Sequence, residues 1–151
     1  MDIYVMRHGQ AEMLAASDNQ RELTKHGRQE VRKMAEMLAD SVHQFDYVLV
    51  SPYVRAQQTW QEVMSVIQRA GSVTSLNELT PSGDAYDIVT LVEQFEPMSQ
   101  VLIISHLPLV GYLVEAFAPD AGAPLFTTAA LAHLRLNDRF QGELLSLTQA
   151  H

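Results

Sequence analysis

The sequence contains no cysteine, which excludes disulfide bonds, thiolate metal sites and a cysteine nucleophile. It also has no apolar run approaching the ~20 residues that a membrane-spanning helix needs. The apolar stretch near the N-terminus covers only Ile3 to Met6, so it does not have the pattern of a secretory signal. We therefore expect no membrane partner, and a cytoplasmic location is the default.

Positive charge is scarce, with 10 Lys and Arg against 18 Asp and Glu and a formal net charge of −8. Such a chain is poorly suited to bind the phosphate backbone of DNA or RNA, so we expect no nucleic-acid partner. Half of the cations lie close together, and the simplest interpretation is the solvated face of one helix. These are Arg21, Lys25, Arg28, Arg32 and Lys33.

The length of 151 residues and an apolar fraction of 47% suit one globular domain over residues 1–151. Apolar runs alternate along it with stretches of helical periodicity, which is typical of βαβ units. We predict strands at residues 3–6, 46–51, 73–76, 101–105, 127–136 and 142–148, and helices at residues 24–39, from 52 to before 71, 84–96 and 108–117. The predicted fold is α/β, with a mostly parallel central sheet, helices on both faces and an antiparallel C-terminal hairpin.

Local signals predict where three of the helices begin. Thr24 and Asp84 are suitable N-caps for the first and third helices. Ser51 is predicted to cap the second helix, with Pro52 at its first helical position. Gly71 is predicted to end that second helix.

Unusual polar residues follow three of the predicted strands. The first strand ends at Arg7 and His8, the second leads into Arg55, and the fourth ends at His106. Because the carboxyl ends of parallel strands share one edge of a sheet, these residues are expected to converge, although about fifty residues separate them in sequence.

This set of residue types suits phosphoryl transfer through histidine. A neutral imidazole attacks phosphorus, while arginine forks and a further donor hold the phosphoryl oxygens. We expect the neighbouring cations to lower the pKa of His8, and a backbone carbonyl to orient its second ring nitrogen. From the residues alone the prediction stops at an anion site suited to phosphoryl transfer. The other histidines are interpreted as ordinary surface residues; they are His26, His43, His133 and His151.

Longer motifs around these residues resemble the histidine phosphatase superfamily, which has the phosphoglycerate mutase-like fold. The resemblance rests on Arg-His-Gly at 7–9, Ser-Pro-x-x-Arg-Ala-x-x-Thr at 51–59 and Ser-His at 105–106. Within that superfamily, the short chain and the runs at 78–84, 104–114 and 126–128 are similar to SixA-type bacterial phosphohistidine phosphatases.

The resemblance implies a role for each matching position. His8 matches the nucleophile that is transiently phosphorylated, and Arg7, Arg55 and His106 match the phosphate pocket. Arg21 matches a further phosphate-binding arginine, although Glu22 replaces the proline that commonly follows it.

The general acid is less well defined. Glu78 lies in about the position of the superfamily's acidic residue, and a catalytic acid and a simple loop carboxylate are equally good interpretations.

The resemblance also implies a cofactor-independent enzyme without a metal, whose substrate is a phosphohistidine-containing phosphotransfer or phosphocarrier protein and whose role lies in phosphorelay signalling. The short connections leave little chain for a lid, so we expect a shallow groove. A phosphatase of small phosphomonoesters is the alternative within the superfamily, and a non-catalytic phosphoprotein-binding module is the alternative outside enzymes. The sequence does not indicate the oligomeric state.

Overall fold

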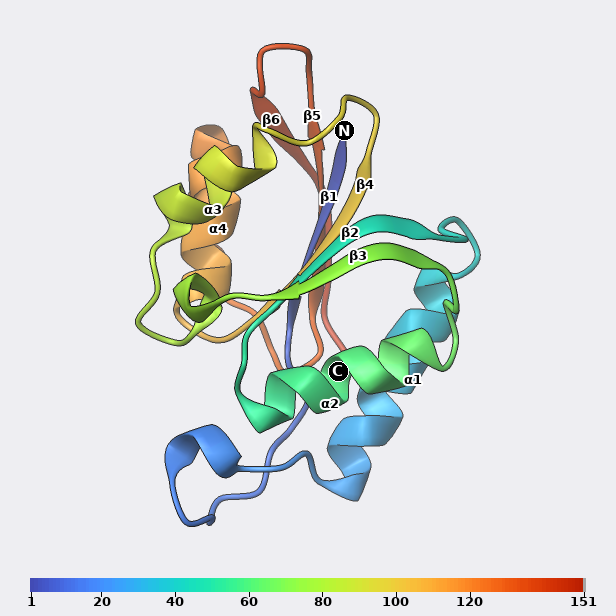
Figure 1. Cartoon of the computed structure of the whole chain (residues 1–151), viewed down its shortest axis with the longest axis vertical. Helices are drawn as coiled ribbons and strands as arrows, with labels where there is room; N and C mark the ends of the chain where they lie inside the picture. The colour runs from blue at the N-terminus through green and yellow to red at the C-terminus, as the bar shows by residue number, and fades with distance from the viewer. Residues whose placement is uncertain (151) are drawn as a thin grey trace.

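The computed structural model describes residues 1–150 and is built around one six-stranded sheet (Figure 1). The strand order is β3-β2-β4-β1-β5-β6. The strands are β1 (Asp2–Arg7), β2 (Phe45–Val50), β3 (Ala70–Ser75), β4 (Gln100–Ser105), β5 (Leu131–Leu136) and β6 (Gly142–Thr148).

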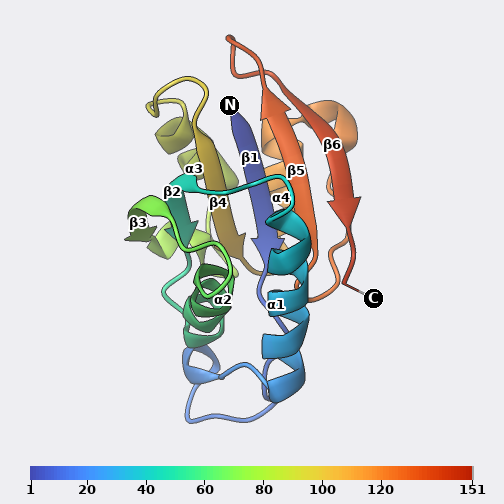
Figure 2. The same cartoon turned by 90° about the vertical axis from the view of Figure 1, so that its right-hand side faces the viewer.

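Two layers of helices enclose the sheet, as the two orthogonal views show (Figures 1 and 2). Helices α1 and α2 lie on one face, and α3 and α4 lie on the other. The helices are α1 (Lys25–Leu38), α2 (Val54–Met64), α3 (Ala85–Val92) and α4 (Leu109–Phe117), and the short 3-10 turns are η1 (Asp18–Gln20), η2 (Asn77–Leu79) and η3 (Pro119–Ala121). None of these described helices has the length and apolar character needed to cross a lipid bilayer.

The first four strands are parallel, whereas β5 and β6 run antiparallel to their neighbours. This arrangement confirms the predicted α/β fold with its antiparallel C-terminal hairpin. In the register of β1 with β4, Arg7 lies opposite Ser105. The carboxyl ends of β1, β2 and β4 therefore lie at the same edge of the sheet (Figure 2).

The central strands are buried on both faces, which explains their continuous apolar runs. All four residues from Val101 to Ile104 in β4 are fully buried, and they alternate between the two hydrophobic cores. A rigid central pair, β1 and β4, therefore supports the loops that follow it.

Two of the predicted caps are confirmed. The Thr24 hydroxyl accepts a hydrogen bond from the Gly27 amide, and the Asp84 carboxylate accepts one from the Tyr86 amide. Each bond satisfies one of the free N–H groups at a helix start.

The prediction for Ser51 is wrong. Helix α2 begins at Val54 with Tyr53 as its N-cap, so neither Ser51 nor Pro52 belongs to the helix. The buried Ser51 hydroxyl accepts a hydrogen bond from the Tyr53 amide and also pairs with His106. The Ser51 hydroxyl, which the local pattern assigned to a helix cap, therefore pairs instead with His106 at the end of β4.

The prediction for Gly71 is also wrong, because α2 already ends at Met64 and Gly71 lies within β3. Strand β3 begins three residues earlier than predicted, since pairing with β2 fixes its start at Ala70 opposite Phe45. Tertiary pairing has overridden the turn preference of glycine here.

Two glycines let α1 approach the turn that follows β1. A Cβ atom on Gly27 would lie 2.1 Å from the Gln10 carbonyl oxygen, and one on Gly9 would lie 2.7 Å from the Gly27 carbonyl oxygen. Any other residue at these positions would push the helix away from the turn that carries His8.

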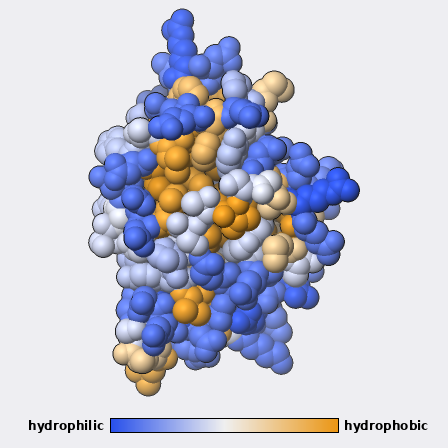
Figure 3. Space-filling model, in the orientation of Figure 1, coloured by the Kyte–Doolittle hydropathy of each residue, from blue (hydrophilic) through white to orange (hydrophobic). Residues whose placement is uncertain are grey.

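The α3 side of the sheet is only partly covered. Figure 3 shows apolar surface over α3 and the space between that helix and the sheet. Tyr47 of β2 stacks on Phe95 there with ring centroids 3.8 Å apart, and Leu76 and Val89 are also only half-buried. On the other face of the sheet, ion pairs join the two helices. Glu62 of α2 pairs with Arg28 and Arg32 of α1 at 3.2 and 3.0 Å.

Candidate active site

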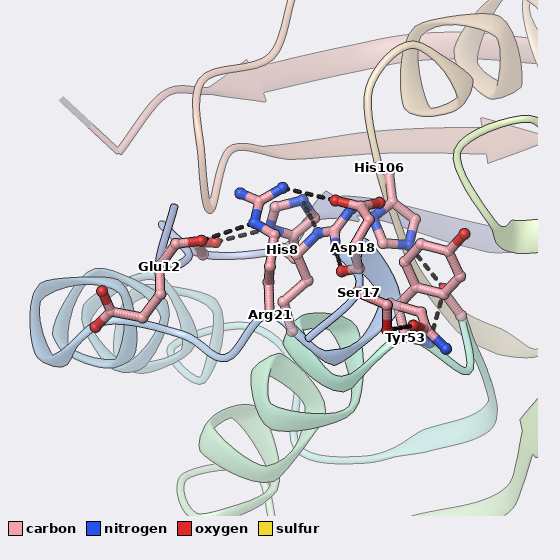
Figure 4. A network of polar contacts seen from close by, with 11 residues as sticks. His8, Glu12, Ser17, Asp18, Arg21, Tyr53 and His106 are labelled. Carbon is pink, nitrogen blue, oxygen red and sulfur yellow. Dashed lines mark hydrogen bonds and ion pairs between the residues drawn. The ribbon is translucent and has the colours of Figure 1, made fainter. Parts of the chain in front are cut away.

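The sheet brings together all four residues that were predicted to converge. Arg7 ends β1, His8 follows it, Arg55 lies in the first turn of α2, and His106 follows β4. His8, Arg55 and His106 are 6%, 4% and 1% exposed. The imidazole rings of His8 and His106 have their centroids 5.0 Å apart (Figure 4).

The two nitrogens of His8 have distinct partners. Its Nδ1 lies 2.7 Å from the Gly9 carbonyl oxygen, which can only accept, so Nδ1 carries the proton. Its Nε2 lies 3.3 Å from Arg55 Nε, which can only donate, so Nε2 presents a lone pair. This geometry confirms the predicted backbone carbonyl partner and leaves Nε2 as the unprotonated ring nitrogen.

Burial keeps His8 neutral. It lowers the pKa of His8 to about 3, with smaller contributions from Arg55, Arg7 and Arg21, while the Gly9 hydrogen bond acts in the opposite direction. The direction agrees with the sequence prediction, but the main cause is burial rather than the neighbouring cations. An uncharged imidazole is the form that can attack phosphorus.

Arg7 and His8 are held by the chain that leads into β5. The Arg7 guanidinium donates to the Phe126 carbonyl oxygen at 3.0 Å, and the Ala129 amide donates to the His8 carbonyl oxygen at 3.0 Å. Ala129 is buried and has a φ of 60°, a left-handed conformation that is uncommon for alanine. Residues 126–130 therefore hold the backbone of the turn that carries His8, a role that no local pattern in the sequence predicts.

His106 is packed between His8 and Tyr53. Its ring centroid lies 5.0 Å from that of each neighbour, and its Nε2 lies 2.7 Å from the Ser51 hydroxyl. Burial lowers the pKa of His106 to about 2, so its ring is also neutral. Its Nδ1 and the Nε of Arg7 are buried and have no hydrogen-bond partner within residues 1–150. Buried polar atoms without a partner are uncommon, and two of them in this cluster suit a polar ligand.

Asp18 is a site residue that the sequence prediction missed. Its carboxylate bridges Arg55 at 3.2 Å and Arg21 at 2.9 Å, and its backbone carbonyl accepts a further bond from Arg55 at 2.7 Å (Figure 4). These bonds with Arg21 and Arg55 lower its pKa although burial raises it, so Asp18 stays an anion. Its spacing of three residues from Arg21 was the available signal in the sequence.

Arg21 lies beside the cluster of His8, Arg55 and His106 and contacts it through Asp18. It bonds to the Asp18 carboxylate and to the Glu12 carbonyl oxygen at 2.7 Å. Arg21 therefore connects to Arg55 through Asp18, which places it near the pocket but outside the group formed by His8, Arg55 and His106. Its role in binding phosphate stays a prediction.

Glu78 makes no polar side-chain contact with the cluster within residues 1–150. It belongs to η2 after β3, its side chain is exposed, and its carboxylate makes no hydrogen bond or ion pair within residues 1–150. The carbonyl oxygen of the adjacent Leu79 accepts a hydrogen bond from the Ser105 hydroxyl at 2.7 Å, so the turn that carries Glu78 is joined to the end of β4 before His106. The loop-carboxylate interpretation fits this placement, and a catalytic role stays untested.

The other histidines have separate places. His26 and His43 are exposed, and His26 pairs with Glu30 at 3.6 Å. His133 is half-buried and bonds to Asp2 at 2.8 Å, on the strand edge away from the site. His151 lies outside the described residues. Within residues 1–150 there is no cluster of three or more His, Asp or Glu that could hold a metal ion.

Comparisons with known proteins agree on the relationship. Residues 3–80 match the histidine phosphatase superfamily, branch 1. The phosphohistidine phosphatase SixA of Escherichia coli is 42% identical over 144 residues, which cover 94% of this chain and 89% of that protein. A SixA homolog of Haemophilus influenzae is 34% identical over 154 residues, covering 96% and 93%.

A solved structure of the protein histidine phosphatase SixA complexed with tungstate superposes with a TM-score of 0.95 at 40% identity, covering 99% of this chain and 97% of that one. A phosphoserine phosphatase of Entamoeba histolytica matches with a TM-score of 0.69 at 16% identity, covering 99% and 98%, and this shows a shared fold alone. The chain therefore belongs to the histidine phosphatase superfamily and is a hydrolase similar over almost its whole length to the SixA phosphohistidine phosphatases.

Proposed function

We propose that this enzyme removes the phosphoryl group from a phosphohistidine on another protein, through a phospho-His8 intermediate. The candidate substrates are histidine-containing phosphotransfer domains and phosphocarrier proteins, and the role is to damp phosphotransfer signals. Similarity to SixA supports the class of reaction. The protonation states within the site support the choice of substrate.

The first step transfers the phosphoryl group to His8. The lone pair on His8 Nε2 forms a bond to phosphorus while the P–N bond of the substrate breaks and returns its electron pair to the substrate imidazole. Arg55 lies 3.3 Å from Nε2 and the His106 ring lies against that of His8. With Arg7, they hold the phosphoryl oxygens and stabilise their charge. The tungstate bound in the related SixA structure is a tetrahedral oxyanion, in keeping with such a pocket.

The second step releases phosphate. Water attacks the phosphorus of phospho-His8, the P–Nε2 bond breaks, and its electron pair returns to His8. The water oxygen leaves in inorganic phosphate, and its proton passes to phosphate or solvent. The Gly9 carbonyl holds the proton on Nδ1 throughout, so the ring is regenerated as the same tautomer.

The observation that carries the substrate choice is that Asp18, the carboxyl group bonded to Arg55, is an anion with no proton to donate. Asp18 is held as an anion by two arginines, and Glu78 makes no polar side-chain contact with the cluster within residues 1–150. An alkoxide leaving group needs a general acid, because its conjugate acid is very weak. A phosphohistidine whose second ring nitrogen is protonated releases neutral imidazole, which needs no donor from the enzyme.

The test compares phosphate release from a phosphohistidine-bearing phosphotransfer domain with release from 3-phosphoglycerate and an aryl phosphate. We expect the phosphoprotein to be far the best substrate, and His8→Ala to be inactive. His43→Ala, which removes an exposed histidine elsewhere, is the matched control and should retain full activity.

Two results would point to the alternatives. A preference for the esters would make the protein a phosphatase of small phosphomonoesters. Binding of the phosphoprotein without turnover would make it a non-catalytic binding module. A quench under alkaline conditions followed by intact-mass measurement should detect phospho-His8, and its absence during turnover would contradict the covalent mechanism.

A further inference from the structure

Ser51 and His106 form a buried pair whose hydrogen bonding can be satisfied in one way only. The Ser51 side chain is fully buried, and its hydroxyl lies 2.7 Å from His106 Nε2. The same hydroxyl oxygen accepts a hydrogen bond from the Tyr53 amide at 3.2 Å. The distances alone leave open which of the two side chains donates to the other, because both can donate and both can accept.

The first assignment has His106 Nε2 donating to Ser51. The hydroxyl oxygen would then accept two bonds, and its own proton would have no acceptor within residues 1–150, at a site with no solvent exposure. A buried hydroxyl proton without a partner costs about 1–3 kcal/mol. His106 Nδ1 would also be a bare acceptor in a pocket built from arginines for an anion.

The second assignment has Ser51 donating to His106 Nε2. The hydroxyl then accepts from Tyr53 and donates to His106, so both of its functions are used. Because the ring is neutral and carries one proton, that proton must lie on Nδ1. Nδ1 is buried, has no partner in the described chain, and belongs to the ring that lies against His8 (Figure 4).

From this hydrogen-bond pattern we propose that Ser51 is a positioning residue, which fixes His106 as the Nδ1–H tautomer so that it donates to a phosphoryl oxygen. His106 Nε2 cannot serve, because Ser51 occupies it. A neutral histidine without this partner could place its proton on Nε2 and present a lone pair to the phosphoryl group. Donation by Nδ1–H strengthens as charge develops on the phosphoryl oxygens, so the expected effect is on kcat rather than KM.

The tautomer can be measured on the unmodified protein, without any assumption about the substrate. Long-range ¹H–¹⁵N NMR of the ¹⁵N-labelled chain distinguishes a protonated ring nitrogen from an unprotonated one. We expect His106 to show a protonated Nδ1 and an unprotonated Nε2 near neutral pH. A protonated Nε2 would overturn the proposal, whatever the enzyme acts on.

The functional part of the proposal rests on the proposed phosphatase activity. Removing an oxyanion donor costs about 10²–10³ in kcat, and an unfixed tautomer should cost less, so we expect Ser51→Ala to lower kcat about tenfold with KM little changed. Ser51→Thr keeps the hydroxyl and should recover most of the rate. Ser99→Ala, which removes another buried hydroxyl at the opposite edge of the sheet, is the matched control for packing loss.

A folded Ser51→Ala protein with unchanged kcat would contradict the role in catalysis, as would an unchanged ¹⁵N pattern of His106 in that variant. If instead no phosphorylated substrate is turned over by the unmodified enzyme while His106 shows the Nδ1–H tautomer, the proposed function fails and the assignment of the tautomer stands.

Discussion

At the scale of single residues, the pocket combines two neutral imidazoles with fixed arginines and one anion. Asp18 occupies two hydrogen-bond positions of Arg55, one through its carboxylate and one through its carbonyl oxygen. A phosphoryl group bound between His8 and Arg55 meets that carboxylate as a neighbour of like charge. Asp18 is therefore expected to weaken binding of any oxyanion to this pocket.

Asp18→Asn tests this expectation, because it keeps the shape of the side chain and removes its charge. A charge pair at a surface contributes at most about 1 kcal/mol, so we expect inorganic phosphate to bind up to about fivefold more tightly in the variant. Isothermal titration at low ionic strength measures the change. Glu12→Gln removes an exposed charge from the same loop and should change affinity far less, whereas weaker binding in Asp18→Asn would mean that Asp18 orients Arg55.

At the scale of elements, α1 is held against the turn that carries His8 by two glycines and a cap. The close approach of Gly27 to Gln10 depends on the missing Cβ atom, and the Thr24 cap fixes where the helix begins. The packing of α1 on the turn after β1 therefore contributes, with residues 126–130, to the position of the His8 backbone.

Gly27→Ala should therefore destabilise the fold although alanine favours helices. Helix propensity predicts a gain of about 1 kcal/mol, but a Cβ 2.1 Å from the Gln10 oxygen forces the helix and turn apart. Overpacking of this kind costs about 1–3 kcal/mol, so we expect a net loss of about 1–2 kcal/mol in urea unfolding together with reduced phosphatase activity. Gln29→Ala on the exposed face of the same helix should leave both unchanged, and a stabilised Gly27→Ala protein would refute the close packing.

At the scale of the whole molecule, burial of His8 and His106 links folding to pH. The pKa of His8 is about 3 in the folded chain and the ordinary value is 6.5, so the unfolded chain binds the extra proton. Stability contributed by neutral His8 is present above pH 6.5 and falls as the pH drops through the interval between the two values. His106, with its pKa of about 2, acts in the same direction.

Each such histidine should reduce the free energy of unfolding by about 1.4 kcal/mol per pH unit between roughly pH 6 and pH 4. His8→Gln removes one of the two contributions, so its stability should fall less steeply with acid than that of the unmodified protein. Urea unfolding at half-unit steps of pH measures both slopes. Parallel curves for the two proteins would show that His8 is not held neutral by the fold.

The periodicity and the turn signals of the sequence by themselves determined the order of strands and helices, the α/β class and the convergence of Arg7, His8, Arg55 and His106. These features could be predicted because they depend on apolar patterns along the chain and on the rule that parallel strands end at one edge. The caps at Thr24 and Asp84 were predictable for the same reason, since each bonds to an amide two or three residues away.

Only the tertiary structure decided which side chains complete the site. Ser51 has a plausible local role as a helix cap, but the strand packing places His106 within 2.7 Å of its hydroxyl, and that contact spans 55 residues. Asp18 reaches Arg55 across 37 residues, and the carbonyl of Phe126 reaches Arg7 across 119. Such partners are fixed by the packing of distant segments, which no local pattern records.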